Sequence, residues 1–494
     1  MTAAVTSSIE ADVLILGAGL AGLRAALSCL EASPSLRLAV ASPSSGPSGS
    51  SFANVNDALG MHACLTDQDR EDYVREVLAL NRGAWLSPEL LAVQAEESEA
   101  RLRDLMALGV PFTRDASGKP LAHSSCFSPG SRRAFVFTGL SKAYECFTTR
   151  LRALGCRFLH GFQAASVLSD PARGALLMPC GAVESGHASA RAECGGPPRP
   201  GQHGPILVRA RAVVAAMGGP ARLFAHSMAG PNPGFGQGVL ARTGARMANL
   251  GFLQYMWGTL PGKTFWQPGV LGAGGYHLAS PGSPENPPVP PVPVEELIPG
   301  IGELSARRAG HCPYGYSLED SAIDLALAEG LDSAGVATLL APDGTPLRVA
   351  PMAHASNGGA VIDEHGQTSV PGILACGECA TGMHGANRVG GGMVLATQVF
   401  GHRAGVRAAL IAENSCTEDS GTARCAELPA DEDERREGLD WLARGLSRYA
   451  ALGGRPGHAA FTAQVRRQLE QARDWRVSLS LETGLGILSN LPVA

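Results

Sequence analysis

The chain has 494 residues, of which 45% are hydrophobic and 17% are charged, and its formal net charge is −5. This length predicts roughly two to four domains, and the hydrophobic fraction excludes a largely disordered chain. The charge balance gives no support for nucleic-acid binding as the main role. No apolar run of about 18 residues predicts a membrane span.

The N-terminal residues are unlike the basic start of a secretory signal, because Glu10 and Asp12 precede the first apolar run. The 12 cysteines are scattered along the chain, which is typical of reduced thiols rather than of a disulfide framework. No cysteine spacing matches a zinc or iron–sulfur site, so we expect no metal centre. Together these features predict a cytoplasmic protein.

The first predicted elements form a βαβ unit. A strand over residues 12–16 is followed by the turn GAGLAG, a helix, and a second strand over residues 37–41. Hydrophobic periodicity and proline content predict the later elements, which are a helical region at 66–107, a loop at 195–205, strands at 206–216, an extended Pro-rich loop at 281–294, short strands and turns at 349–375, a helix at 392–412 and amphipathic helices at 430–476.

The turn of this βαβ unit carries a dinucleotide-binding pattern. Gly17, Gly19 and Gly22 give G-x-G-x-x-G between a strand and a helix, where the backbone can approach a pyrophosphate at the helix N-terminus. The acidic residue that usually binds a ribose after the second strand is replaced by Ala41 and Ser42. This replacement argues against plain NAD binding and leaves Ser42 or the backbone to contact a ribose.

Residues 349–405 contain several ordered motifs, among them AHASNGG, PGILACGE, HGANRVGG and FGHRAG. This segment resembles the flavoprotein subunits of succinate dehydrogenase and fumarate reductase, and L-aspartate oxidase, in which AH-x-x-x-GG, PGLYAAGE, HGANRL and FG-x-x-A follow in the same order. Shorter similarities lie at 213–219, 232–238 and 249–255, so the resemblance covers roughly residues 10–410.

The resemblance implies an α/β fold with a Rossmann-type FAD-binding domain, an inserted α+β capping domain and a short C-terminal helical region. The FAD-binding domain is expected in two segments, residues 1–239 and 349–412. The capping domain is expected at 240–348 and the helical region at 413–494.

The resemblance also implies FAD as the cofactor. Respiratory members attach FAD to a histidine near the position of residues 49–52, where this chain has Gly-Ser-Ser-Phe, so we expect non-covalent FAD. The residues implied to bind it are Gly17, Gly19, Gly22, Ser42, Ser50, Ser51, Asn54, Gly218, Gly238, Glu378, Met393 and Val394.

The substrate site of the family is retained in part. His354 and Arg388 match two residues that bind a carboxylate in these proteins, and we expect them to be catalytic. On the cap side the family histidine is replaced by Met256, and the segment starting at Gln267 lacks the family threonine and glutamate. A second carboxylate would therefore be buried without a partner. We expect a small carboxylate substrate that is not a C4 dicarboxylate.

The arginine that transfers the proton in the family has no clear counterpart. Arg307, Arg308, Tyr314 and Tyr316 lie near the expected place, and the pocket is expected to include Met256, Gln267 and Tyr316. Cys376 and Cys379 form a C-x-x-C pair that could carry electrons beside a flavin. We favour two ordinary thiols, because such redox pairs normally begin a helix.

These features predict an FAD-dependent oxidoreductase that transfers a hydride between a small carboxylate and FAD. Three alternatives stay open. The chain could be a flavoprotein subunit that passes electrons to an iron–sulfur partner protein, a fumarate reductase or L-aspartate oxidase proper, or a flavin-binding protein without catalysis.

Overall fold

The computed structural model describes residues 2–3, 7–54, 56–169, 173–180, 204–230, 232–279, 290–415 and 428–492. Most of the predicted loop at 195–205 and of the Pro-rich loop at 281–294 lies outside these residues. The described end of the Pro-rich segment contributes strand β16 (Val292–Pro293) to the edge of a sheet. In the described part of the chain, no helix is both long and apolar enough to cross a membrane.

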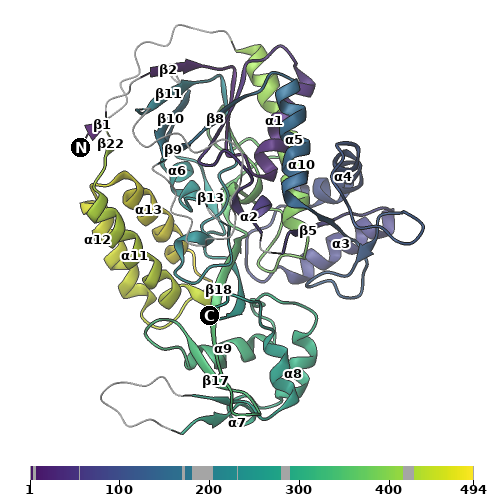
Figure 1. The fold of residues 1–494 in the computed structure, drawn as a ribbon, viewed down its shortest axis with the longest axis vertical. Helices are drawn as coiled ribbons and strands as arrows, with labels where there is room; N and C mark the ends of the chain where they lie inside the picture. Colours follow the sequence, from purple (N-terminus) through teal and green to yellow (C-terminus); the bar gives the residue numbers. More distant parts are fainter. Residues whose placement is uncertain are drawn as a thin grey trace.

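A parallel five-stranded sheet forms the centre of the larger lobe (Figure 1). Its strands are short, and all but the edge strand β8 are buried on both faces, as expected of Val- and Leu-rich runs in a parallel sheet. In spatial order they are β20 (Ile373–Ala375), β12 (Ala212–Ala215), β3 (Val13–Leu16), β4 (Leu38–Ser42) and β8 (Arg157–His160). Because β20 pairs with β12, segments far apart in the sequence build one sheet.

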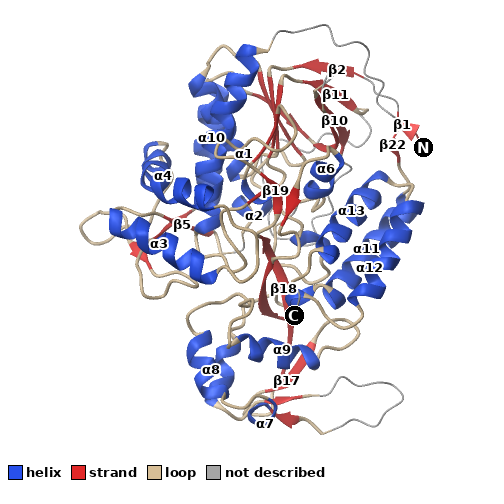
Figure 2. Ribbon diagram, turned by 180° about the vertical axis from the view of Figure 1, so that it is seen from behind, coloured by secondary structure: helices blue, strands red, loops and turns tan. Residues whose placement is uncertain are grey.

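Two helices, α1 (Leu20–Ala32) and α10 (Gly392–Asn414), lie side by side against this sheet (Figures 1 and 2). Every residue of α1 from Leu20 to Leu30 is buried, so the helix fills the layer between the sheet and α10. Glycines let the two backbones approach closely: a Cβ atom on Gly405 would lie 2.2 Å from the carbonyl oxygen of Ala25.

Smaller sheets and helices surround the central sheet. The four-stranded sheet contains β2 (Ser7–Glu10), β11 (Ile206–Arg209), β10 (Gly174–Pro179) and β9 (Phe162–Leu168). One three-stranded sheet contains β5 (Ala58–His62), β7 (Ala134–Thr138) and β6 (Ala122–His123). Another contains β13 (Met247–Ala248), β19 (Gly359–Val361) and β21 (Ala380–Thr381). Strands β1 (Thr2–Ala3) and β22 (Leu428–Pro429) form a two-stranded sheet. The larger lobe also contains the helices α2 (Gly49–Phe52), α5 (Leu140–Ala153) and α6 (Gly236–Arg242).

The helical region expected at 66–107 consists of two helices, α3 (Asp67–Leu80) and α4 (Pro88–Ala107). The break has a local cause. Pro88 stands in the first turn of α4, and the Ser87 side chain caps that helix by accepting a hydrogen bond from the Leu90 N–H.

The smaller lobe contains an antiparallel five-stranded sheet and three helices, and we call residues 253–279 and 290–356 the cap (Figure 2). The sheet order is β14 (Leu253–Thr259), β18 (Pro346–Ser356), β17 (Ala337–Leu340), β15 (His277–Leu278) and β16, and the helices are α7 (Val294–Leu297), α8 (Ile301–Arg308) and α9 (Ser321–Glu329). Strand β18 runs from the cap to the centre of the molecule, so the cap is connected directly to the larger lobe.

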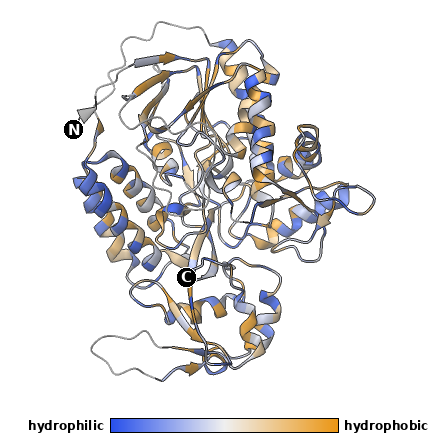
Figure 3. Ribbon diagram, in the orientation of Figure 1, coloured by the Kyte–Doolittle hydropathy of each residue, from blue (hydrophilic) through white to orange (hydrophobic). Residues whose placement is uncertain are grey.

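The chain closes with α11 (Glu432–Tyr449), α12 (His458–Gln471) and α13 (Trp475–Ser489). The amphipathic helices expected at 430–476 are present, but α13 extends to Ser489, beyond the predicted end. The polar faces of α11 and α12 point outward, as Figure 3 shows. Their buried side chains, Leu442 and Phe461 among them, join an apolar core that continues into the cap.

Candidate active site

The turn between β3 and α1 has the geometry that a pyrophosphate site needs. Gly17 has φ +114°, and a Cβ atom there would lie 2.2 Å from the Ala216 carbonyl oxygen. A Cβ atom on Gly22 would lie 2.0 Å from the Gly17 oxygen. At Gly19 the nearest atom is the Ser51 Oγ at 3.6 Å, so the backbone there is open. Gly17 thus permits the tight turn, Gly22 allows close packing, and Gly19 leaves room for a ligand to approach the backbone.

The N-terminus of α1 is free to receive an anion. Gly19 occupies the cap position and makes no side-chain capping bond, and the Leu20 N–H donates to the Ser51 Oγ at 3.2 Å. Ser50 directly precedes Ser51 in the sequence, and its Oγ is buried without a hydrogen-bond partner among the described residues. A helix N-terminus with such donors favours a phosphate group.

Four other residues that were predicted to bind FAD make contacts within the protein. Ser42 ends β4 and accepts from the Ser44 N–H at 3.3 Å, and Asn54 accepts from the Asn56 N–H at 2.9 Å. Gly218 has φ +80° in the turn after β12. Gly238 lies against α13, because its N–H donates to the Thr483 Oγ1 at 3.0 Å.

Glu378 lies half-buried behind this turn. Its carboxylate accepts hydrogen bonds from the Gly219 N–H at 3.1 Å and from the Ser356 N–H at 2.9 Å. Burial raises the pKa of Glu378, while these two N–H donors and the Arg388 charge act in the opposite direction. The carboxylate therefore joins the turn after β12 to the end of β18.

Met393 and Val394 lie in the first turn of α10. Gly391 precedes the helix with φ +80° and makes no side-chain cap. Its carbonyl oxygen accepts from the His62 N–H at 3.2 Å. The N-terminal amides of α10 therefore form a second site that is suited to negative charge.

Several buried polar atoms around these turns have no hydrogen-bond partner among the described residues. They belong to residues from both sequence segments of the larger lobe, which is the distribution that a dinucleotide spanning the lobe requires. These atoms are Ser50 Oγ, His62 Nδ1 and Nε2, Asn232 Oδ1, Gln237 Oε1 and His384 Nε2. Together with the open glycine turn, they fit an FAD molecule.

Arg388 is buried and held by two side chains of the β14 and β18 region. Its Nη2 donates to Gln254 Oε1, and its Nε donates to Asn357 Oδ1 at 3.2 Å. Burial lowers the pKa of Arg388 to about 10, while the charge of Glu378 opposes this shift. The guanidinium is thus positively charged at neutral pH and fixed in orientation.

His354 lies on β18, and its Nδ1 is buried without a hydrogen-bond partner in the described part of the chain. Burial, and then the charge of Arg388, lowers the pKa of His354 to about 4. The edge of Phe265 approaches its ring, with 6.3 Å between the centroids. At neutral pH the site therefore combines a charged Arg388 with a neutral His354.

The three pocket residues expected on the cap lie in different environments. Met256 on β14 is half-buried opposite Met352 on β18. Gln267 donates through Nε2 to the Cys312 Sγ at 3.4 Å, and its Oε1 is buried without a partner among the described residues. Tyr316 lies in the apolar core, where its hydroxyl donates to the Leu253 carbonyl at 2.6 Å.

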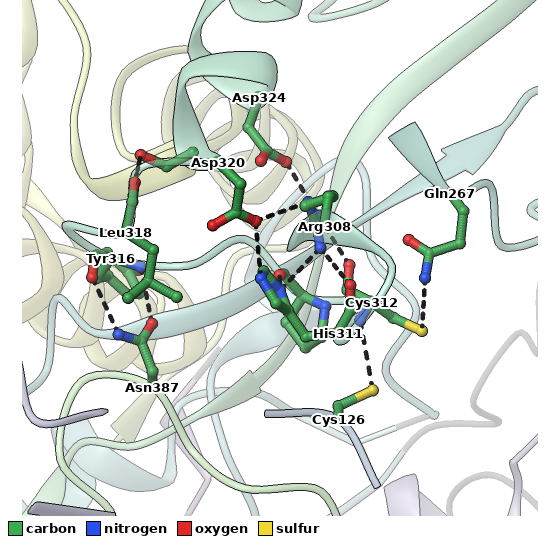
Figure 4. Close-up of polar contacts among 12 residues, drawn as sticks. Cys126, Gln267, Arg308, His311, Cys312, Tyr316, Leu318, Asp320, Asp324 and Asn387 are labelled. Carbon is green, nitrogen blue, oxygen red and sulfur yellow. Dashed lines mark hydrogen bonds and ion pairs between the residues drawn. The ribbon is translucent and has the colours of Figure 1, made fainter. Parts of the chain in front are cut away.

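The other side chains considered for proton transfer also contact neighbouring residues of the protein. Arg308 is fully buried, and it donates to Asp324 at 3.2 Å and to the Cys312 carbonyl at 3.0 Å (Figure 4). Arg307 is half-exposed and pairs with Glu303 at 2.7 Å. Tyr314 packs against Tyr316, with 5.0 Å between the ring centroids.

Cys376 and Cys379 are both fully buried beside the turn after β12. The Cys379 Sγ accepts from the Met217 N–H at 3.2 Å and donates to the Gly218 carbonyl at 3.6 Å. Burial raises the pKa of both thiols, that of Cys379 to about 12. Such thiols are poor nucleophiles, which supports the interpretation that they are ordinary core residues.

Comparison with known proteins identifies the cofactor. A family profile described as FAD binding domain matches residues 12–284 and 322–394, more than half of the chain. The chain belongs to this FAD-binding family. FAD is therefore its cofactor, and the buried polar atoms and glycine turns described above are consistent with it.

This flavoprotein also has named relatives. One is a subunit of the fumarate reductase (CoM/CoB) of Methanothermobacter marburgensis, with 28% identity over 82% of this chain and 74% of that protein. Another is the L-aspartate oxidase of Streptomyces coelicolor, with 28% identity over 80% of this chain and 68% of that protein. The resemblance to this group of FAD-dependent oxidoreductases is confirmed.

Solved structures confirm the α/β fold of the flavoprotein. A point variant of the Escherichia coli quinol fumarate reductase FrdA superposes with a TM-score of 0.65 at 19% identity, covering 98% of this chain and 88% of that chain. Apo Sdh1 of Mycobacterium smegmatis gives a TM-score of 0.66 at 20% identity, covering 98% and 86%.

Sequence reasoning missed the residues that hold Arg388 and the contact between Cys126 and Cys312. Gln254 lies within the motif NLGFLQY and Asn357 within AHASNGG, so both stood in segments already singled out. Their contact with Arg388 depends on the pairing of β14 with β18. The two cysteines lie 186 residues apart, and no local pattern connects them.

Proposed function

We propose that this flavoprotein oxidises or reduces a small monocarboxylate whose far end is apolar. The observation that carries the proposal is the pairing of a fixed, charged Arg388 with a cap strand pair that places Met256 opposite Met352. Arg388 uses Nε and Nη2 to hold Asn357 and Gln254, and its Nη1 makes no hydrogen bond to the residues that the structure describes. That nitrogen is available to a carboxylate.

The cap side of the site supports an apolar group. Met256 and Met352 face each other on β14 and β18, and a Cβ atom on Gly258 would lie 2.5 Å from the Met228 side chain. Phe265 stands beside His354. A second carboxylate placed among these methionines would lose its hydration without gaining a charged partner, which is unfavourable by several kcal/mol, on the order of a buried unpaired ion.

The roles of the protein groups follow from this arrangement. Arg388 binds and orients the carboxylate, and neutral His354 exchanges a hydrogen bond with the same end of the substrate. The cap excludes water from the site, which strengthens both interactions. Bound FAD supplies two-electron chemistry, as acceptor or donor of a hydride.

Anaerobic titration of the purified holoprotein tests the substrate class. Absorbance of the oxidised flavin, at about 450 nm, is followed against aspartate, succinate, and aliphatic and aromatic monocarboxylic amino and hydroxy acids. The fully reduced flavin is titrated separately with fumarate and unsaturated monocarboxylates. We expect only monocarboxylates to react. Fast reaction with succinate, aspartate or fumarate would overturn the proposal.

A matched pair of variants locates the carboxylate site. Arg388→Lys keeps the charge but cannot bind Asn357, Gln254 and substrate together, and we expect substrate affinity to fall about 10- to 100-fold. Arg222→Lys, on an exposed 3-10 turn, serves as control and should leave affinity unchanged. Equal behaviour of both variants would contradict the role of Arg388.

The electron acceptor is a separate question, and we propose a partner protein for this role. Two relatives are named as subunits of larger enzymes, the Methanothermobacter protein above and a fumarate reductase flavoprotein subunit of Serratia, which supports a partner protein for this chain. Affinity purification of the protein from its native cells tests this proposal. Recovery of a stoichiometric iron–sulfur protein is the expected result, and rapid reoxidation by O2 of a protein recovered alone would argue against it.

A further inference from the structure

Two cysteines from different lobes meet at the boundary between the cap and the larger lobe (Figure 4). Cys126 lies in the loop between β6 and β7, and Cys312 lies between α8 and α9 of the cap. The Cys312 N–H donates to the Cys126 Sγ at 3.4 Å. Both residues are half-buried, in contrast to the fully buried Cys376 and Cys379.

The two segments that carry these thiols are joined by further contacts. The Phe127 N–H donates to the Gly310 carbonyl at 3.1 Å, and the Phe127 ring stacks on His311 with 4.3 Å between the centroids. Gln267 donates to the Cys312 Sγ. These contacts hold the two segments together at the boundary, so the two cysteines stay next to each other.

The surroundings give the two thiols different reactivity. The neighbouring Cys312 side chain lowers the pKa of Cys126 to about 6; burial opposes this effect, and the Cys312 N–H, His311 and Arg308 add to it. The Cys126 side chain, together with burial, raises the pKa of Cys312 above its usual range. At neutral pH Cys126 is therefore the thiolate that attacks first, and Cys312 is the thiol that reacts in the second step.

We propose that Cys126 and Cys312 form a dithiol site that reduces low-molecular-mass disulfides and thereby links the cap covalently to the larger lobe. The Cys126 thiolate attacks one sulfur of the disulfide R–S–S–R, and the first R–S⁻ leaves and takes a proton from water. Once Cys126 is in the mixed disulfide, its negative charge no longer raises the pKa of Cys312. Cys312 then gives its proton to water, and its sulfur attacks the Cys126 Sγ and displaces the second R–S⁻. Two protein thiols are oxidised to one disulfide, and one small disulfide is reduced to two thiols.

The position of the pair connects it with the proposed carboxylate site. The Gly390 N–H donates to the Cys126 carbonyl at 2.9 Å, and the Cys126 thiolate interacts electrostatically with Arg388. A Cys126–Cys312 bond would fix the cap beside the loop that follows Arg388. The effect of this link on turnover rests on the proposed function, whereas formation of the link does not.

Oxidised glutathione is the probe for the test. The FAD-loaded protein is incubated with it at pH 7, free thiols are blocked, and peptides are identified by mass spectrometry. We expect loss of two thiols and a peptide pair joined through Cys126 and Cys312, both reversed by dithiothreitol. Absence of this peptide pair, with the flavin still bound, would overturn the proposal whatever the substrate is.

Three variants define the order of the steps. Cys312→Ser should stop at a mixed disulfide of glutathione on Cys126, and Cys126→Ser should give no joined peptide. Cys146→Ser removes a half-buried thiol on α5 and is the control, which should form the joined peptide as the wild type does. Glutathione retained on Cys312 rather than on Cys126 would contradict the assigned roles.

Discussion

Arg388 owes its fixed position to two side chains that are distant from it in the sequence. The motif HGANRVGG marked it as a carboxylate ligand, but only the structure shows that Gln254 and Asn357 engage Nε and Nη2. The same applies to Tyr316, which stands near the expected proton donor in sequence but uses its hydroxyl on the Leu253 carbonyl. A motif identifies a residue type, and the fold decides which of its atoms are free.

The thiolate at Cys126 is testable by its pH dependence. Because its pKa is about 6, alkylation by iodoacetamide should rise with pH and reach half of its limiting rate near pH 6. In the Cys312→Ala variant the side chain that lowers this pKa is removed, and we expect the midpoint to move upward. The rate is measured by mass spectrometry of the Cys126 peptide in the holoprotein. A midpoint above pH 8 in the wild type would exclude the proposed thiolate.

At the scale of elements, the strands and helices with strong patterns were predicted well. The βαβ unit, the strands at 206–216 and the helix at 392–412 follow from apolar runs and the glycine turn. The break between α3 and α4 was missed because the helical periodicity on both sides outweighed the local signals at Gly83 and at Ser87 and Pro88. The extension of α13 to Ser489 was missed because its burial comes from packing on α6 and α11, which local sequence does not reveal.

The close contact between α1 and α10 gives a prediction about stability. Gly405→Ala places a Cβ atom 2.2 Å from the Ala25 carbonyl oxygen, so the helices must separate. We expect the free energy of unfolding to fall by about 1–3 kcal/mol. Gly302→Ala, at an exposed position on α8 with no atom within 4 Å, should leave it unchanged or raise it by about 0.5 kcal/mol. Urea denaturation of both variants measures the difference, and equal effects would contradict this account of the contact.

At the scale of the whole molecule, the cofactor attachment can be tested directly. Residues Gly49–Phe52 form α2 and contain no histidine, so we expect FAD to be released when the protein is precipitated with acid. Flavin absorbance in the supernatant, compared with that of the intact protein, gives the released fraction. Flavin that stays with the precipitate would show a covalent bond to another residue.

The buried histidines predict how stability depends on pH. Burial lowers the pKa of His62 and of His402 to about 3 and that of His354 to about 4, whereas the unfolded chain binds these protons near pH 6.5. Between about pH 6.5 and 4 the unfolded state therefore binds more protons, and stability falls as the pH falls.

Denaturation at several pH values measures this effect. The His402→Gln variant should lose stability less steeply over this range than the wild type. His365→Gln, at an exposed position, is the control and should keep the wild-type slope. The same slope in His402→Gln and the wild type would contradict the contribution of His402.

The path of β18 has a consequence for protein engineering. Residues Gln254, His354 and Asn357, on or beside β14 and β18, surround Arg388 in the proposed carboxylate site, and the same two strands are part of the cap sheet. The cap is therefore not an exchangeable module. A chimera that receives the cap of a relative also receives that relative's groups on β14 and β18 around Arg388, so its substrate preference should follow the donor of the cap rather than the donor of the flavin-binding lobe.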